Sequence, residues 1–406
     1  MRWTMADFFQ NGEITNLHRL RTGDVERLEK ELKGFSQKRP IALVLPALFQ
    51  DLTAMPIKNI LSEIAKVNYL NEIVVTLGRT NKEEFAKVKE MFASLNPPVA
   101  IIWNDGENIQ ELYSILDKEG VSAGGDGKGR SAWIAYGYIL ARGKSDVIVL
   151  HDCDIVTYDR ELLGRLCYPV VNPNLDYEFC KGYYARVTNR LHGRVTRLFV
   201  TPLIRALKKI VGRDEFLEYL DSFRYILAGE FSMRADLARI NRIPGDWGLE
   251  VGVLAEVYRN CSLRRICQVE IADNYEHKHQ PLSETDPGTG LNKMSIDIAK
   301  IIFRTMASMG VIFPSGWVKT LKATYLRTAQ DFIAKYGHDS EIDGLIFDRH
   351  QEAVSVETFV KGIELACDEF EKDPFGAPQI ANWNRVTAAI PNFFDRLKSA
   401  VEKDNK

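Results

Sequence analysis

The stretch Val147-Ile148-Val149-Leu150-His151-Asp152-Cys153-Asp154 decides the fold and points to the chemistry. Its four apolar, mostly β-branched residues predict a buried strand, and two acidic residues at i and i+2 follow. Because side chains alternate along an extended chain, Asp152 and Asp154 are expected on one side of the sheet, just beyond its carboxyl edge, where open α/β sheets place ligands. Two carboxylates there suit Mg²⁺ or Mn²⁺ together with substrate phosphates; the alternative is an ordinary turn with solvated acids.

Three apolar runs upstream repeat this strand pattern, at 41–45 (ended by Pro46), 73–77 and 99–103. Between the runs, helical periodicity is predicted at 55–67, 82–94 and 130–142. Strands that alternate with helices over the first ~155 residues indicate a parallel α/β sheet.

A glycine-rich segment, Gly124-Gly125-Asp126-Gly127-Lys128-Gly129-Arg130-Ser131, precedes the third of these helices. Glycines permit close backbone approach, a helix N-terminus favours anions, and Lys128 can neutralise a phosphate. The segment matches neither the P-loop nor the dinucleotide fingerprint, so a flexible connector is the alternative. Because it lies beside the Asp-x-Asp strand in sequence, the pair predicts a site for a diphosphate and a divalent metal.

Three segments further along the chain carry candidate side chains: 192–197 with Arg194 and Thr196, 245–252 with Glu250, and 274–281 with two histidines. A guanidinium, a hydroxyl and helix-start amides would hold a phosphate or carboxylate. Neutral imidazole can ligate a metal. The alternatives are a basic helix cap, a solvated glutamate and ordinary surface histidines.

The C-terminal third is predicted to be helical, because 294–309, 317–335, 355–371 and 383–401 show apolar residues at three-and-four spacing. We expect this region to serve in oligomerisation. The predicted organisation is a polar N-terminal arm (1–40), two halves of an α/β domain (41–155 and 156–290) and a helical region (291–406).

The composition of the chain argues against several classes of function and location. Lys plus Arg number 53 against 55 Asp plus Glu, and without a basic excess nucleic acid is not an expected partner. Six cysteines with no C-x-x-C pair and no zinc spacing predict a reducing, cytoplasmic location. The sequence shows neither a signal-peptide pattern nor ~18 uninterrupted apolar residues, so neither export nor a membrane span is expected.

Taken in order, the motifs resemble the glucosyl-3-phosphoglycerate synthase family of GT-A glycosyltransferases, including its mannosyl-3-phosphoglycerate synthase-like members. The resemblance covers roughly Ile41 to Leu282. It is carried by the proline-ended first strand, Gly127-Lys128-Gly129, Asp152-Cys153-Asp154, Gly193-Arg194-Val195-Thr196, Gly229-Glu230, Gly248-Leu249-Glu250-Val251-Gly252 and His277-Lys278-His279. The fold it implies is GT-A: a Rossmann-like mixed sheet flanked by helices, here with a helical C-terminal region.

The resemblance implies a metal-dependent, retaining transfer of glucose or mannose from a nucleotide diphosphate sugar to the 2-hydroxyl of 3-phosphoglycerate. The product would be an intermediate toward compatible solutes or polysaccharide precursors. GDP-glucose, UDP-glucose and GDP-mannose stay open as donors, and a homodimer is expected. Residues 41–155 would bind the donor and 156–290 the acceptor. The implied roles are donor contacts for Pro46, Ala47, Gln50, Lys128, Asp152, Cys153, Gly229 and Glu230; acceptor contacts for Gly193, Arg194, Thr196 and His279; Mg²⁺ or Mn²⁺ ligation for Asp154 and His277; and catalytic roles for Glu250 and Asp154.

Three alternatives stay open at this stage. The acceptor could be unphosphorylated D-glycerate. A nucleotidyltransferase also sets a glycine-lysine loop and acids on an α/β sheet. A catalytically silent sugar-nucleotide-binding protein would be stabilised by nucleotide without turnover.

Overall fold

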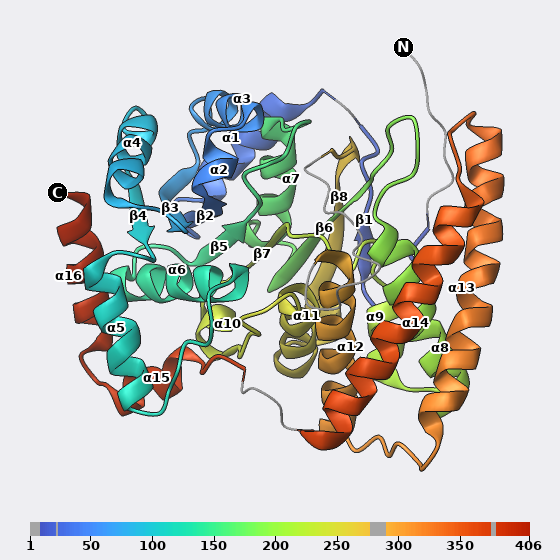
Figure 1. Ribbon diagram of the computed structural model, residues 1–406. Coiled ribbons are helices and arrows are strands. Elements are labelled where there is room, and N and C mark those ends of the chain that lie inside the picture. Colours follow the sequence, from blue (N-terminus) through green and yellow to red (C-terminus); the bar gives the residue numbers. More distant parts are fainter. Residues whose placement is uncertain (1–8, 22, 277–289, 375–378) are drawn as a thin grey trace.

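A mixed sheet of eight strands organises the computed structural model, which describes residues 9–21, 23–276, 290–374 and 379–406 (Figure 1). The strand order is β1-β8-β6-β7-β5-β2-β3-β4, in which β7 runs antiparallel to both β5 and β6 and the other pairs are parallel. The strands are β1 (Thr15–Leu17), β2 (Ile41–Leu48), β3 (Leu70–Gly78), β4 (Val99–Trp103), β5 (Val147–Leu150), β6 (Phe179–Ala185), β7 (Phe231–Arg234) and β8 (Ile266–Asn274). The expected α/β mixed sheet is confirmed.

The four predicted strands correspond to β2, β3, β4 and β5, but β2 does not end at Pro46. It continues to Leu48 beside β3, whereas its pairing with β5 stops where Val44 lies opposite Leu150. Val44 O accepts from the His151 amide on the β5 side. By alternation Pro46 faces that same side, beyond the end of β5, so its missing N–H costs no ladder hydrogen bond.

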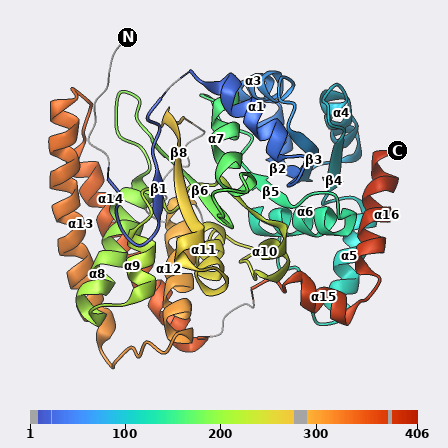
Figure 2. The same cartoon turned by 180° about the vertical axis from the view of Figure 1, so that it is seen from behind.

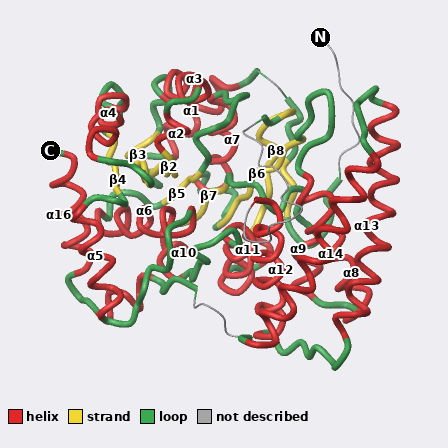
Figure 3. Tube along the Cα trace, viewed as in Figure 1, coloured by secondary structure: helices red, strands yellow, loops and turns green. Residues whose placement is uncertain are grey.

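Helices cover both faces of the sheet because alternate strand residues enter two separate cores. Leu43 and Leu45 of β2 belong to one core, and Ala42 and Val44 to the other. One group of helices packs on the first core and another on the second. Figure 1 shows the two groups on opposite faces of the sheet, and Figure 3 shows the strands between them. The first group is α1 (Val25–Phe35), α2 (Phe49–Leu52), α3 (Met55–Ile64), α4 (Lys82–Phe92) and α7 (Arg160–Val171); the second includes α5 (Glu107–Lys118), α6 (Lys128–Arg142), α10 (Ala235–Ile240) and α11 (Leu249–Asn260).

The N-terminal stretch expected to be a polar arm contributes to the sheet and to a core. Strand β1 pairs with β8 at the sheet edge. Helix α1 buries Leu28 and Leu32 against α7, where a Cβ on Gly164 would lie 2.8 Å from Leu28.

The helical C-terminal region is confirmed, and most of it packs beside β8 and β1 (Figures 1 and 2). There α12, α13 and α14 all contact a π-helical turn, and α13 also packs against α8. Their bounds, with those of the smaller neighbours, are α12 (Gly290–Ser308), α13 (Trp317–Ile342), α14 (Arg349–Lys372), the π-helix (Val195–Val200), α8 (Thr201–Val211), α9 (Glu215–Asp221) and a 3₁₀ turn (Leu263–Arg265). No helix in the described ranges has the length and apolar character needed to cross a bilayer.

The last segment returns to the opposite end of the sheet. The helix predicted at 383–401 is two helices, α15 (Trp383–Ala389) and α16 (Phe393–Asn405). They separate at Ile390, whose φ of −132° and ψ of 85° lie outside the helical region, which the following Pro391 disfavours. Trp383 stacks on Trp133 of α6 with centroids 4.0 Å apart. Asn405 then pairs with edge strand β4, accepting from Ile101 N at 3.0 Å and donating to Ile101 O at 2.7 Å.

Candidate functional site

The two aspartates of the Asp-x-Asp motif follow β5 at the carboxyl edge of the sheet, as predicted. Asp152 Oδ1 forms an ion pair with Lys128 Nζ at a distance of 2.6 Å. Asp154 lies two residues further along the chain, and burial first, then the nearby charge of Asp152, raise its pKa to about 7. A buried carboxyl that resists ionisation is one that lacks enough positive charge around it.

Lys128 is the first residue of α6 and contributes a positive charge to this site. Its Nζ lies 2.6 Å from Asp152 and 3.3 Å from Glu250. Burial alone would lower the pKa of Lys128, but the charges of Asp152 and Glu250 outweigh that effect and raise it. The lysine therefore carries a full positive charge at neutral pH.

The glycines on either side of Lys128 allow close packing against another loop of the chain, which the sequence did not predict. A Cβ on Gly129 would lie 1.9 Å from Pro244 O, and one on Gly127 would lie 2.4 Å from Gly245 O. These glycines allow the start of α6 to pack against the 244–245 loop of the same chain. That loop leads into α11, so the packing brings Glu250 to Lys128.

Gly229 and Glu230, which precede β7, complete the carboxylate group. A Cβ on Gly229 would lie 2.7 Å from both Asp152 Oδ2 and Lys128 Nζ, so any larger residue there would displace the Asp152–Lys128 ion pair. Glu230 is fully buried and accepts from Tyr184 Oη at 2.7 Å and Tyr275 Oη at 2.5 Å. Burial and the charge of Asp152 raise the pKa of Glu230, while the two tyrosine hydroxyls and Lys128 oppose the shift.

Sequence reasoning missed Lys181, a lysine in the apolar run of β6. It is 1% exposed, donates to Ala228 O at 2.6 Å and lies beneath the Gly229–Glu230 turn. Burial lowers the pKa of Lys181 to about 8. A lone lysine inside a strand of buried residues was the available signal, because a buried ammonium needs specific partners.

The remaining predicted donor contacts lie at the end of β2 and after β5. Ala47 is buried and Pro46 half-buried at the end of β2, and Gln50 is exposed on α2. The Cys153 side chain is 2% exposed within the core under α7, so of this residue only the backbone faces the site edge.

The predicted acceptor motif lies at the start of the π-helix. Gly193 has φ +69°, and a Cβ there would lie 3.1 Å from Tyr225 Oη, which also accepts from Arg186 at 3.1 Å. The Thr196 hydroxyl is buried and has no hydrogen-bond partner among the described residues. A buried hydroxyl and glycine-permitted backbone approach are features of a ligand site.

Stacked tyrosines join this motif to the carboxylate group. Tyr184, which donates to Glu230, lies 4.9 Å from the Tyr225 ring and 3.8 Å from the Tyr275 ring. Tyr225 in turn contacts Gly193. The structure therefore places the donor-type and acceptor-type motifs next to each other.

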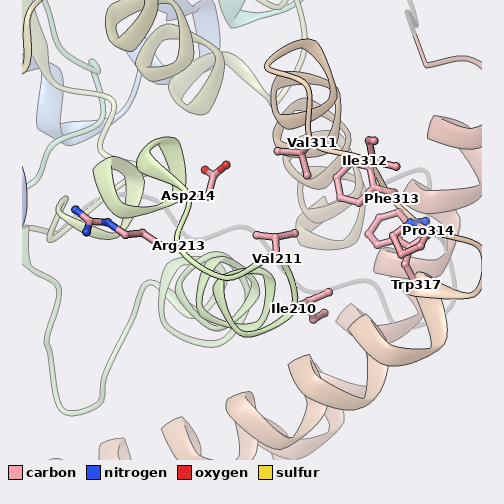
Figure 4. A pocket seen from close by; sticks show the side chains of 9 residues that line it. All are labelled: Ile210, Val211, Arg213, Asp214, Val311, Ile312, Phe313, Pro314 and Trp317. Carbon is pink, nitrogen blue, oxygen red and sulfur yellow. The ribbon is translucent and has the colours of Figure 1, made fainter.

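A cavity of about 390 Å³ shares no lining residue with this site. It lies between the end of α8 and the link from α12 to α13, and most of its lining is apolar (Figure 4). Ile210 and Val211 line it from α8, Phe313 from the link, and Trp317 from the start of α13. It lacks the carboxylates that define the candidate site.

The metal prediction rests in part on His277, which with His279 lies outside the described residues. Within the described ranges, no three His, Cys, Asp or Glu side chains form a group that could hold a metal ion. The residues present still fit a divalent cation, because Asp152, Asp154, Glu230 and Glu250 outnumber the two lysines and the pKa of Asp154 is raised. Mg²⁺ is commonly held by one or two carboxylates plus substrate phosphates.

Individual known proteins match this chain over nearly its whole length, although no family model matches it. The chain is 51% identical over 401 residues to the glucosyl-3-phosphoglycerate synthase of Persephonella marina, covering 99% of both chains. It is 38% identical over 405 residues to the enzyme of that name from Methanococcoides burtonii, covering 98% of both.

Solved structures confirm the fold. The glucosyl-3-phosphoglycerate synthase of Mycobacterium tuberculosis in complex with phosphoglyceric acid aligns with a TM-score of 0.52 at 21% identity, over 75% of this chain and 90% of that chain. The same enzyme with Mn²⁺ and UDP-glucose aligns with a TM-score of 0.51 at 22% identity, over 75% and 89%.

Proposed function

Because the chain belongs to the glucosyl-3-phosphoglycerate synthase family, we propose that it transfers glucose from UDP-glucose to the 2-hydroxyl of 3-phosphoglycerate. The products are glucosyl-3-phosphoglycerate and UDP. The observation that carries this proposal is the 51% identity over 99% of both chains. The adjacency of an anion-binding motif to a lysine–carboxylate site supports it.

In the donor site, Lys128 faces the diphosphate and Asp152 the ribose. Lys128 is suited to this because its pKa is raised, so its charge is constant across physiological pH. Asp154 and His277 would hold the Mg²⁺ or Mn²⁺ ion, which neutralises charge on the departing diphosphate. Glu230, held by Tyr184 and Tyr275, fixes the floor beneath the sugar.

In the acceptor site, Arg194 and the Thr196 hydroxyl bind the phosphate and carboxylate of 3-phosphoglycerate, with Gly193 and His279 beside them. The positive φ of Gly193 turns the chain so that the following backbone N–H groups face the ligand. The two anionic groups of the acceptor match a guanidinium, which binds such groups in fork geometry.

The transfer breaks the bond from the sugar C1 to the diphosphate oxygen and forms one from C1 to the acceptor O2. For a retaining reaction on one face, the departing phosphate oxygen takes the acceptor proton. Glu250, buried and held by Lys128, then orients the donor and stabilises positive charge that develops at C1.

The finer organisation follows from this assignment. Residues 41–155 form the donor half, 156–290 the acceptor half and 291–406 the helical region. The six cysteines are all free thiols, which supports a cytoplasmic location. The expected homodimer is tested by light scattering of the purified protein.

The activity test is release of nucleoside diphosphate, with UDP-glucose, GDP-glucose and GDP-mannose each crossed with 3-phosphoglycerate and D-glycerate, with and without Mg²⁺. We expect release with UDP-glucose and 3-phosphoglycerate only when metal is present. Release with D-glycerate would reassign the acceptor. If no combination of donor and acceptor releases nucleoside diphosphate but UDP raises the melting temperature, the result would indicate a binding protein. Pyrophosphate release from a nucleoside triphosphate plus sugar phosphate would indicate a nucleotidyltransferase.

A further inference from the structure

A buried glutamate of the C-terminal helical region binds the acceptor motif. Glu352, in the first turn of α14, is 5% exposed. One carboxylate oxygen accepts from Arg194 Nε at 3.1 Å and the other from Arg197 Nη1 at 2.9 Å. We propose that Glu352 is a positioning residue, which orients Arg194 toward the phosphate or carboxylate of the three-carbon acceptor.

The second arginine makes Glu352 a fixed support. Arg197 donates from Nε to His192 O at 2.7 Å and lies 4.8 Å from the Tyr336 ring centroid. Because Arg197 is held on three sides, the carboxylate that binds it has a single orientation. The other carboxylate oxygen of Glu352 then has a fixed position, and this position orients the Arg194 side chain that binds it.

Glu352 binds Arg194 through Nε, which leaves the two terminal Nη groups available for a ligand. Only Nε is engaged, and among the described residues no hydrogen bond reaches either terminal Nη group. The Arg194 side chain is 33% exposed. An acceptor anion can therefore bind the two Nη groups while Glu352 keeps Nε, so the glutamate supports binding and does not compete with it.

Segments on either side of the motif are bonded to the helical region that carries Glu352. Ile346 N donates to Asn189 O at 2.8 Å, and Tyr325 of α13 donates to Leu198 O at 2.7 Å. Asp348 caps α14 by accepting from Gln351 N. A cavity of about 50 Å³ lies at this junction, lined by Arg190, Arg194, Arg197 and Glu352 among others. The helical region thus completes the acceptor site from outside the α/β domain.

The test, which rests on the proposed function, compares Glu352→Gln and Glu352→Ala with the wild type in the UDP-release assay. Each variant should raise the KM for 3-phosphoglycerate by about tenfold or more, with the KM for UDP-glucose within twofold. The matched control is Glu364→Gln, on the same helix, which removes an exposed ion pair to Lys322 and should leave both constants unchanged.

A double variant separates positioning from packing. In an Arg194→Ala background, Glu352→Gln should add no further change in acceptor KM, because its target is gone. An additional increase of the same size as in the wild-type background, or an equal rise in both KM values of the single variant, would overturn the proposal.

A binding readout keeps the two proposals distinguishable. If the wild type releases no UDP with any acceptor, the proposed function fails, and the inference is judged by the rise in melting temperature that 3-phosphoglycerate produces. A rise in the wild type that is lost in Glu352→Gln but kept in Glu364→Gln supports the positioning role. An equal rise in all three proteins overturns it.

Discussion

Replacing Lys128 by methionine should reduce kcat/KM for UDP-glucose by about 10- to 150-fold. Methionine keeps the aliphatic length of the side chain and removes its charge. Lys128 Nζ lies 2.6 Å from Asp152 and 3.3 Å from Glu250, and under the proposed function it also faces the donor diphosphate. A hydrogen bond to a charged group contributes about 1.5–3 kcal/mol, and each 1.4 kcal/mol is tenfold in rate, which gives that range.

The control for this prediction is Arg79→Met. Arg79 also bonds an acid of the neighbouring loop, Asp126 at 3.0 Å, but its side chain is 69% exposed. Exposed pairs contribute about 0–1 kcal/mol, so kcat/KM should fall less than about fivefold.

The assay is initial-rate UDP release at saturating 3-phosphoglycerate and Mg²⁺, with circular dichroism to confirm that both variants are folded. If Lys128→Met is folded and loses no more kcat/KM than Arg79→Met, the diphosphate role of Lys128 is wrong. The ion pairs of Lys128 would then be structural.

Three further predictions address the metal, the acceptor and the buried lysine. Asp154→Ala should remove most turnover and the rise in melting temperature caused by Mn²⁺, with an unchanged circular dichroism spectrum; full activity would exclude Asp154 as a ligand. Arg194→Ala should raise the KM for 3-phosphoglycerate far more than the KM for UDP-glucose, and equal changes in the two steady-state constants would show a structural role. Lys181 has a folded-state pKa of about 8, below its unfolded value, so the unfolded chain binds more protons at alkaline pH and wild-type stability rises with pH. Relative to Lys181→Met, which cannot titrate, the wild type should gain about 1 kcal/mol in urea unfolding between pH 7 and pH 9; a constant difference would refute the lowered pKa.

The sheet was predictable where the signal was local. The runs at 41–45, 73–77 and 147–150 are buried on both faces, and the edge run at 99–103 is partly buried, so all four read as continuous apolar segments. The Asp-x-Asp motif was predictable for the same reason, because the end of a buried strand fixes where the next residues lie.

Other elements had weak or ambiguous local signals. Strand β1 has three residues, too few for a periodic pattern. The sequence did not predict α1, α5 or α7. The glycines at 127 and 129 suggested approach to a phosphate, whereas the structure shows approach to Pro244 and Gly245.

The supporting residues of the site could not be found from spacing at all. Glu352 lies 158 residues after Arg194, and Tyr184 reaches Glu230 across 46 residues. Such contacts depend on the packing of whole elements, and nothing in the neighbouring sequence marks one buried glutamate or tyrosine as a partner.

The pairing of Asn405 with Ile101 sets an order of events during synthesis. The two residues are 304 positions apart. At ribosomal rates of about 5–20 residues per second, Asn405 is therefore synthesised roughly 15 to 60 s after Ile101 of β4. Throughout that interval the edge of β4 presents unpaired amides and carbonyls, the surface on which strands of other chains add. A chain that lacked Asn405 would contain every site motif and still carry this open edge. The turn that contains Asn405 therefore protects β4 from pairing with strands of other chains.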